Sequence, residues 1–360
     1  MDAPGRLGRG RARGVSEMRW PLPVDPYTDE LLSSFLVRAA HRHGLAPYRF
    51  CAFHFPGIPF WNRDIDRSAS DALLTMVASK AGLSPARVMQ MTLRSAEARL
   101  GQSVASASAP WINRIGIYHR LRRGWGLQYC PDCLAEQPVL SYGWRMSFMV
   151  VCSRHRRLLQ DACPYCDVPL AIHRQMLSAQ LCHHCSRVLG RKPQDPNVSI
   201  DAVLQAQFYF ERALHDGFAQ INGQSVISKD LFQGARVLAS MLATSVPSLH
   251  HSAGHKRPSL EQARVQARTD VVLCVAELLA GWPLGFKKIA TDQHLTQRSF
   301  VRKSLPDWLK SAVEELPAGR TRHPSLRKQH SLRAKLAHDR RRNADWRATR
   351  AALLWEAASK

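Results

Sequence analysis

The sequence predicts a mainly α-helical protein that contains small zinc-ribbon modules. Three observations predict this class. Apolar residues recur at helical spacing in both terminal parts of the chain. Seven of the nine cysteines fall between positions 130 and 185, most of them in closely spaced pairs. The composition, 45% hydrophobic and 22% charged over 360 residues, is that of a globular protein. This length corresponds to about two or three domains.

The charge balance of the chain is strongly basic. Lys and Arg number 51 against 28 acidic residues, a net charge of +23. Such an excess predicts a polyanionic partner, most simply nucleic acid. The longest apolar runs fall short of the roughly 18 residues that a membrane span needs. The first 20 residues lack the apolar segment of a secretory signal, so we expect a cytoplasmic protein without a membrane contact.

Composition divides the chain into five expected segments. The first carries five Arg and four Gly and is expected to be disordered, although an inert leader would look the same. A Ser/Ala-rich stretch ends the second segment, and the last holds twelve Lys/Arg against three acids. The expected segments are a basic arm (1–19), an N-terminal helical domain (20–110), tandem zinc modules (111–190), a C-terminal helical domain (191–318) and a basic tail (319–360).

The N-terminal segment predicts a helix-turn-helix-like unit. An apolar stripe at 32, 35, 36 and 39 indicates a first helix. Further on, Gly82 permits a turn, Ser84 can cap a helix, and Pro85 suits the first helical position, so we expect a helix from 85 to about 100. A base-reading face of this helix would carry Ser84, Arg87, Gln90 and Arg94. An ordinary helical hairpin with a solvated basic face is the alternative.

Four ligand pairs with knuckle spacing lie within 56 residues. Two intervening residues let a tight turn direct both ligands at one ion, and tetrahedral zinc needs two such turns. Sequential pairing gives one site with three thiolates and an imidazole, and a second with four thiolates. Interleaved pairing is the alternative. The pairs are Cys130 and Cys133, Cys152 and His155, Cys163 and Cys166, and Cys182 and Cys185.

Both predicted zinc ions are structural, because four protein ligands leave no open position for a catalytic water. Three further histidines, His173, His183 and His184, lie close enough in sequence to replace a ligand of the second site. Cys51 and His54 also have knuckle spacing and offer a third metal site as an alternative to burial in the core.

Arginines cluster near these pairs, where a rigid turn could present them to phosphates or to an acidic protein surface. A solvated face is the alternative. The candidates are Arg122, Arg123, Arg154, Arg156 and Arg157. The stretch 142–151 fits both strand and helix periodicity, and we expect it to pack against the first zinc site.

The C-terminal part predicts helices over 203–218, 270–279 and 306–315. Motifs of common enzymes are missing from the chain. There is no phosphate-binding loop, nucleophile elbow or H-E-x-x-H zinc motif, and the deaminase pairing of H-x-E with P-C-x-x-C is absent. These absences predict a protein that is not an enzyme.

Taken in order, several motifs resemble the TniQ/TnsD family over about residues 20–290. Arg156 stands where the family pattern has Gly after the second knuckle. The short length is more similar to TniQ than to TnsD. The motifs are Glu30–Ala40, Gly82–Ser84, Met91–Leu93, Leu127–Leu134, Trp144–Phe148, Val151–His155, Cys163–Cys166 and Trp282–Phe286.

The resemblance implies a non-catalytic accessory protein of DNA transposition. Such proteins select or mark a target and recruit an AAA+ ATPase, which activates a DDE transposase. Some members bind DNA directly, and others dock, often as dimers, on an RNA-guided CRISPR effector. The family's zinc positions carry over to the eight ligands named above. A helix-turn-helix and zinc-ribbon transcription regulator is the alternative function.

Overall fold

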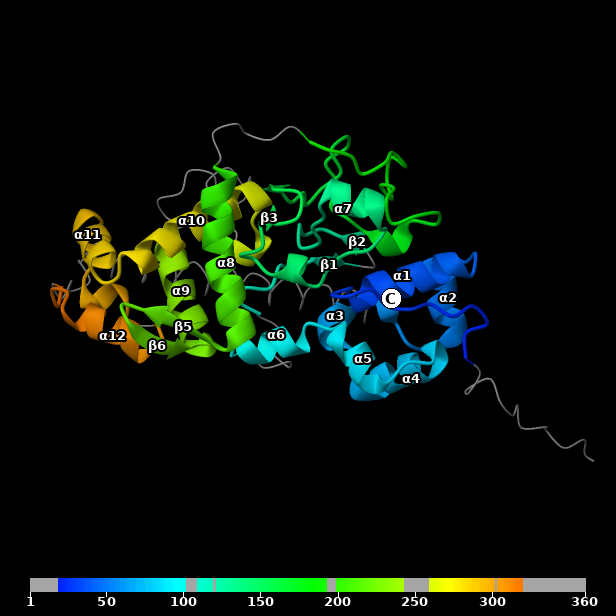
Figure 1. The fold of residues 1–360 in the computed structure, drawn as a ribbon, viewed down its shortest axis with the longest axis horizontal. Coiled ribbons are helices and arrows are strands. Elements are labelled where there is room, and N and C mark those ends of the chain that lie inside the picture. The colour runs from blue at the N-terminus through cyan, green and yellow to red at the C-terminus, as the bar shows by residue number, and fades with distance from the viewer. Residues whose placement is uncertain are drawn as a thin grey trace, which may run out of the picture.

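The computed structural model describes residues 19–101, 109–118, 121–192, 199–242, 259–301 and 303–319 (Figure 1). Apart from Arg19 and Gly319, the expected basic arm and the expected basic tail lie outside these residues. The described part is mainly helical and contains three two-stranded antiparallel sheets. Among the described helices, none combines the length and hydropathy that a bilayer crossing needs.

Six helices form the N-terminal part. The apolar stripe of α1 is fully buried, as its spacing predicts. Ser84 caps α5 through its hydroxyl, which accepts the amide of Arg87 at 3.2 Å. The expected helix from 85 to 100 breaks at 91–93, so α5 has only six residues. The helices are α1 (Leu32–Arg42), α2 (Pro47–His54), α3 (Ile65–Ser68), α4 (Asp71–Ala81), α5 (Pro85–Gln90) and α6 (Arg94–Arg99).

The middle part holds little regular structure. Residues 142–151 form neither a long strand nor an α-helix but a 3-10 turn, Gly143–Arg145, followed by a short strand. Besides a second 3-10 helix, Ile172–Arg174, the remaining regular elements are two hairpins and one α-helix. They are β1 (Ile117–Tyr118) with β2 (Leu121–Arg122), α7 (Pro131–Glu136), and β3 (Val151–Cys152) with β4 (Arg157–Leu158).

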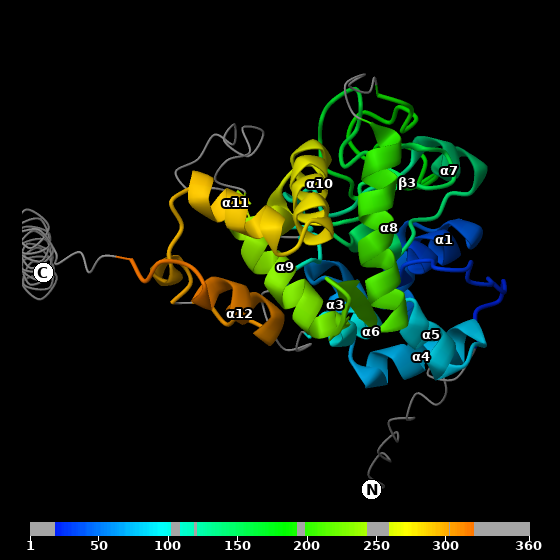
Figure 2. The same ribbon diagram turned by 60° about the vertical axis from the view of Figure 1, so that its left-hand side comes forward.

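The C-terminal part is helical around one hairpin. The three predicted helices occur as α8, α10 and α12, whereas the hairpin β5–β6 follows Gly217 without having been expected. In both views α8 stands between the C-terminal helices and the rest of the fold (Figures 1 and 2). The elements are α8 (Ile200–Asp216), β5 (Phe218–Ile221), β6 (Gln224–Ile227), α9 (Ser228–Leu242), α10 (Val265–Ala280), α11 (Leu284–Asp292) and α12 (Asp307–Glu314).

An aromatic cluster joins the middle part to the C-terminal helices. The ring centroids of Trp111 and Phe210 lie 5.6 Å apart, and those of Phe148 and Phe232 lie 5.5 Å apart. All four side chains are buried. Gln207 of α8 adds a polar link, since its Oε1 accepts hydrogen bonds from the amides of Val150, just before β3, and Val151, its first residue, both at 2.9 Å. The zinc-module region therefore shares its core with α8 and α9.

A buried ionic cluster joins the middle part to the N-terminal helices. The guanidinium of Arg145 is 1% exposed and lies 2.6 Å from a carboxylate oxygen of Asp64 and 3.2 Å from one of Asp66. Asp66 also accepts hydrogen bonds from the amide and the hydroxyl of Ser33 in α1. The opposite charges and the hydrogen bonds together offset the desolvation cost of burying these groups.

Gly234 of α9 allows α12 to pack closely. A Cβ atom at this position would overlap the ring of Trp308, which Asp230 holds by a 3.1 Å hydrogen bond from the indole. Helix propensity favours Ala over Gly by about 1 kcal/mol. Because the ring is anchored, we expect the cost of the steric overlap to exceed the gain in helix propensity. Gly234→Ala should therefore lower the free energy of unfolding by about 1–3 kcal/mol. Urea denaturation measures this value.

Gly190→Ala is the control for this substitution, because the nearest atom to its Cβ would be 3.5 Å away, an ordinary contact. Equal stability of Gly234→Ala and the wild type would show that α12 is not packed on α9 in solution.

His54 makes stability sensitive to acid. Burial, the nearby Lys80 and then His43 lower the pKa of His54 from 6.5 to about 4. The native side chain is therefore neutral in a pH range where the unfolded side chain binds a proton. Its contribution to stability is present above pH 6.5 and is lost as the pH falls toward 4.

We expect His54→Gln to flatten this dependence. The wild type should lose more free energy of unfolding than the variant between about pH 7.5 and about pH 5. Metal loss at low pH affects both proteins, so the difference between them isolates the histidine. His215→Gln is the control, because the His215 side chain is 88% exposed. Parallel pH profiles for His54→Gln and the wild type would contradict the prediction.

Candidate metal centres

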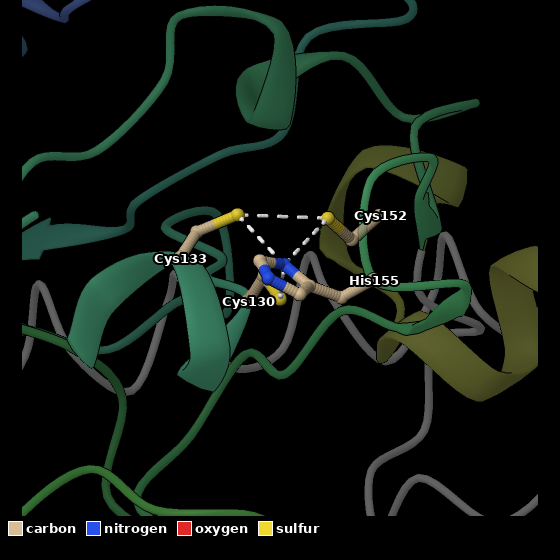
Figure 3. Close-up of side chains that lie close together, drawn as sticks. All are labelled: Cys130, Cys133, Cys152 and His155. Carbon is tan, nitrogen blue, oxygen red and sulfur yellow. Dashed lines mark hydrogen bonds between the residues drawn. The ribbon is translucent and has the colours of Figure 1, made fainter. Parts of the chain in front are cut away.

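The first cluster gathers four side chains from α7 and the β3–β4 hairpin (Figure 3). Cys130 precedes α7 and Cys133 lies in its first turn, while Cys152 ends β3 and His155 lies in the hairpin turn. The Sγ atoms of Cys133 and Cys152 are 3.6 Å apart. The Nδ1 atom of His155 lies 3.5, 3.2 and 3.7 Å from the three sulfurs in chain order.

The second cluster consists of four cysteines on two similar turns. The Sγ atoms of Cys163 and Cys185 are 3.6 Å apart, and those of Cys166 and Cys182 are 3.7 Å apart. The eight side chains thus group in sequential order, with Cys130, Cys133, Cys152 and His155 in one cluster and Cys163, Cys166, Cys182 and Cys185 in the other. The interleaved pairing does not occur.

The same backbone turn recurs after three of the ligand pairs. The residues that follow the second ligand, Arg156, Asp167 and Ser186, have φ values of 48°, 51° and 57°. Left-handed φ favours glycine, which explains why a glycine is expected at position 156. Arg156 adopts this conformation without disrupting the cluster.

The dimensions of both clusters fit tetrahedral zinc. A zinc ion with bonds of about 2.3 Å to sulfur separates two sulfur ligands by about 3.8 Å. The sulfur separations match this edge, and within each cluster all ligand atoms lie within 4.8 Å of one another. Thiolate and imidazole are also the donors that zinc prefers. With four protein donors, neither cluster needs a water ligand.

Glu136 orients the imidazole of the first cluster. Its carboxylate lies 3.2 Å from Nε2 of His155, so the ring turns Nδ1 toward the sulfurs. A carboxylate at the distal nitrogen selects the tautomer that binds metal and makes the imidazole a stronger ligand. Glu136 also pairs with Arg154 at 2.6 Å. The neighbouring arginine therefore supports the cluster rather than standing free.

Local hydrogen bonds favour thiolate at selected cysteines. A hydrogen bond from Cys130 lowers the pKa of Cys152 to about 5 against the effect of burial. The backbone amide of Arg187 lowers the pKa of Cys185 to about 7. By contrast, a hydrogen bond to Cys152, together with burial, raises the pKa of Cys130. Metal binding displaces the remaining protons, so metal affinity rises with pH.

Other candidate ligands lie outside these clusters. The ring of His173 stacks on Trp61 with centroids 4.9 Å apart and an angle of 17°. His183 and His184 belong to neither cluster, and Cys51 with His54 forms no further cluster among the described residues. Cys51 is instead buried in the N-terminal core, where burial raises the pKa of its thiol.

The predicted base-reading residues make intramolecular contacts. Arg87 donates to the carbonyls of Pro26 and Tyr27, each at 3.3 Å, and to the side chain of Gln90. Arg94 pairs with Asp71. Because these contacts tie the N-terminal segment and α4 together, the two arginines support the fold.

Most of the arginines near the clusters are engaged as well. Arg154, Arg156 and Arg157 pair with Glu136, Asp201 and Asp132, respectively. Arg122 donates to the carbonyl of Trp61 at 3.3 Å, and burial lowers its pKa to about 10. Arg123 is exposed just after β2.

Sequence reasoning missed two buried arginines that hold the parts together. One is Arg145, described above. The other, Arg268 of α10, is fully buried and donates to the side chains of Asn113 at 3.0 Å and Gln128 at 2.9 Å. Burial lowers its pKa to about 10. The sequence indicated the burial of Arg268 only by placing an arginine within an apolar helical segment.

Fold and clusters together define a class: a mainly helical protein that contains a three-cysteine, one-histidine cluster and a four-cysteine cluster. Residues 21–159 match the sequence model of the TniQ family. Residues 21–159 therefore form a TniQ family domain, which covers less than half of the chain. The match contains the whole first cluster and ends before the second. No curated protein matches the chain.

Proposed function

We propose that this chain is a non-catalytic accessory protein of DNA transposition. It selects or marks the target and recruits an AAA+ ATPase, which in turn activates a DDE transposase. The target is either DNA itself or DNA held by an RNA-guided CRISPR effector. The observation that carries the proposal is the TniQ match over 21–159, which coincides with the N-terminal helices and the first cluster.

Two zinc ions, one in each cluster, serve this function as scaffolding. Four protein ligands close each site, so zinc would hold the turns in place and would not activate water. The rigid middle part then fixes the N-terminal helices relative to α8, through Arg145 on one side and Gln207 on the other. An adaptor needs such a fixed arrangement to present two partners to each other.

The contact with nucleic acid is better placed on arginines that have no carboxylate partner. Among the described residues, Arg42, Arg49 and Arg174 are exposed and pair with no acid. They lie on α1, on α2 and on the 3-10 helix Ile172–Arg174, which contact one another. Unpaired cations on adjoining elements are suited to bind successive phosphates.

Binding to the ATPase and to DNA tests the proposal separately. Purified chain should co-elute with an AAA+ transposition ATPase in size-exclusion chromatography, and the absence of a complex both with and without DNA would refute the adaptor role. DNA affinity should fall steeply with salt, and each phosphate contact removed should lower the slope of log K against log salt by about 0.9.

A triple variant, Arg42→Gln, Arg49→Gln and Arg174→Gln, should therefore lower that slope by about 3. The matched control replaces Arg154, Arg156 and Arg157 with Gln, since their side chains already pair with carboxylates. An equal or larger effect in the control would place the DNA contact at the clusters instead.

A further inference from the structure

The surface on which Arg42, Arg49 and Arg174 lie, here called the arginine face, is built from elements that contain no acidic residue. These elements are α1, α2 and the 3-10 helix that ends at Arg174, and they contact one another. The whole segment 31–63 also lacks Asp and Glu. Arg63, at its end, is exposed and pairs with no acid in the described part of the chain. These elements therefore attract a polyanion and contribute no negative charge that opposes it.

Two aromatic side chains stand on the exposed side of α2. Tyr48 is 49% exposed and Phe53 is 67% exposed, and the exposed Arg49 lies on the same side of the helix. The inward side of α2 is occupied by Phe50 and Cys51, which are buried. The Tyr48 and Phe53 rings thus lie outside the hydrophobic core. Exposed aromatic rings among cations indicate a binding surface, because the fold itself does not use their apolar area.

A hollow of about 240 Å³ adjoins the ring of Tyr48. Tyr48 and Ala52 of α2 form part of one wall, and residues 57–62 form the other. Every side chain that lines the hollow is uncharged. An uncharged recess with an aromatic wall, placed beside exposed arginines, is suited to a flat, neutral group that is attached to a negative charge. A nucleotide has this combination, since its base is neutral and its phosphate is charged.

Contacts between the elements fix the arginine face relative to the hollow. Trp61, in the wall of the hollow, stacks on His173 of the 3-10 helix with ring centroids 4.9 Å apart. Nε2 of His41 in α1 donates to the carbonyl of Gln175, just after this 3-10 helix, at 2.9 Å. Figure 1 shows α1 and α2 side by side at the end of the molecule opposite α11 and α12. The cations and the rings are therefore presented on one preformed surface.

We propose that the arginine face binds a single-stranded stretch of the target DNA and that Tyr48 and Phe53 stack on its bases. The arginines hold the phosphates, and the hollow beside Tyr48 receives one base. A charged surface with aromatic rings is typical of proteins that bind unpaired strands. In a duplex the bases stack on each other, so a duplex offers this face only phosphates. An acidic peptide would pair with the arginines but would give the rings no flat partner.

This inference rests on the proposed function and names the state of the DNA that the adaptor recognises. Fluorescence anisotropy on the full chain tests it with two labelled strands of about 20 nucleotides, oligo(dT) and an abasic strand of equal charge. The wild type should bind oligo(dT) at least about fivefold more tightly than the abasic strand, because only oligo(dT) has bases that can stack. Equal affinity for the two strands would overturn the inference.

Substitutions at Phe53 test the stacking itself. Phe53→Ala and Phe53→Leu should both lower the preference for oligo(dT) about fivefold or more, whereas Phe53→Trp should retain it. Since the ring is 67% exposed, metal content and thermal stability should not change. Phe218→Ala is the control, because Phe218 is 48% exposed and β5 lies far from α2 (Figure 1). An undiminished preference in Phe53→Leu, or an equal loss in Phe218→Ala, would contradict the assignment.

Three further ligands separate single-stranded DNA from other occupants of the arginine face. Phe53→Ala should leave the affinity for a blunt DNA duplex unchanged, and an equal loss for duplex and single strand would overturn the preference for unpaired DNA. Oligo(U) that binds more tightly than oligo(dT) would overturn the assignment to DNA. An oligoglutamate peptide should compete with oligo(dT) no better than the abasic strand does, and better competition would assign the face to an acidic protein.

Co-elution with the AAA+ ATPase separates this inference from the proposed function. Wild-type chain that co-elutes with the ATPase but binds both strands equally leaves the adaptor function standing and overturns the inference. Wild-type chain that does not co-elute refutes the adaptor role, and the ratio of the two strand affinities then decides the chemistry of the arginine face on its own. Co-elution of both the wild type and Phe53→Ala, with the preference for oligo(dT) lost only in the variant, supports both.

Discussion

Removing zinc from this chain should unfold its middle part. Chelation is expected to make residues 130–190 sensitive to protease and to abolish the cooperative unfolding transition. A structural zinc contributes about 10–16 kcal/mol of apparent binding free energy in small zinc modules. The whole stability of a typical domain is only about 5–15 kcal/mol. Loss of the metal is therefore the largest single change predicted for the protein.

The middle part contains little regular structure that could replace the stabilisation from zinc binding. Apart from α7, its regular elements are strands of two residues and short 3-10 turns. Its backbone follows tight turns that converge on the cysteines, and without metal the buried thiols lose their common partner. Because Gln207 and Phe210 of α8 contact Val151 and Phe148 of this region, unfolding should spread into the C-terminal helices.

Cys163→Ser tests the prediction one ligand at a time. Elemental analysis should give about two zinc ions per wild-type chain and about one in the variant, which should be insoluble or readily digested. Cys274→Ser is the control, because Cys274 lies on α10 away from both clusters and should leave two zinc ions in place. A soluble, protease-resistant Cys163→Ser protein would show that the second cluster is not structural.

Arg145→Met should cause the largest loss of stability outside the clusters. The guanidinium is buried against two carboxylates, so its removal leaves Asp64 and Asp66 with uncompensated charge. Breaking a buried ion pair in this way costs about 3–5 kcal/mol. The loss should also loosen the N-terminal helices from the middle part, because Asp66 is held by Ser33 of α1.

An exposed pair of equal length provides the control. Arg154 lies 2.6 Å from Glu136, the same distance as Arg145 from Asp64, but its side chain is 66% exposed. Arg154→Met should therefore change the free energy of unfolding by only about 0–1 kcal/mol. Urea denaturation of both variants compares them directly. Replacing Asp64 and Asp66 with Asn in the Arg145→Met background should recover part of the loss, and similar losses for Arg145→Met and Arg154→Met would refute the argument.

The contrast between these arginines marks the limit of sequence reasoning on this chain. Sequence reasoning predicted phosphate contacts for the arginines near the clusters, and that remains a prediction, but it did not foresee their carboxylate partners. Their partners are distant in sequence, as for Arg156 with Asp201 and Arg145 with Asp64. Nothing local distinguishes a paired arginine from a free one, because pairing depends on which segments the fold brings together. The free cations on α1 and α2 drew no attention for the same reason.

The sequence pattern alone predicted those features that depend on residues close together in the chain. Two residues between ligands define a knuckle, so spacing predicted the eight donors, and the structure then selected sequential over interleaved pairing. Helical periodicity similarly located α8, α10 and α12. Tertiary structure alone decided the hairpin after α8, the break between α5 and α6, and the burial of Arg145 and Arg268. Each of these depends on contacts between residues that are far apart in the chain and on the burial that those contacts cause. The residues next to a position in the sequence do not reveal such contacts.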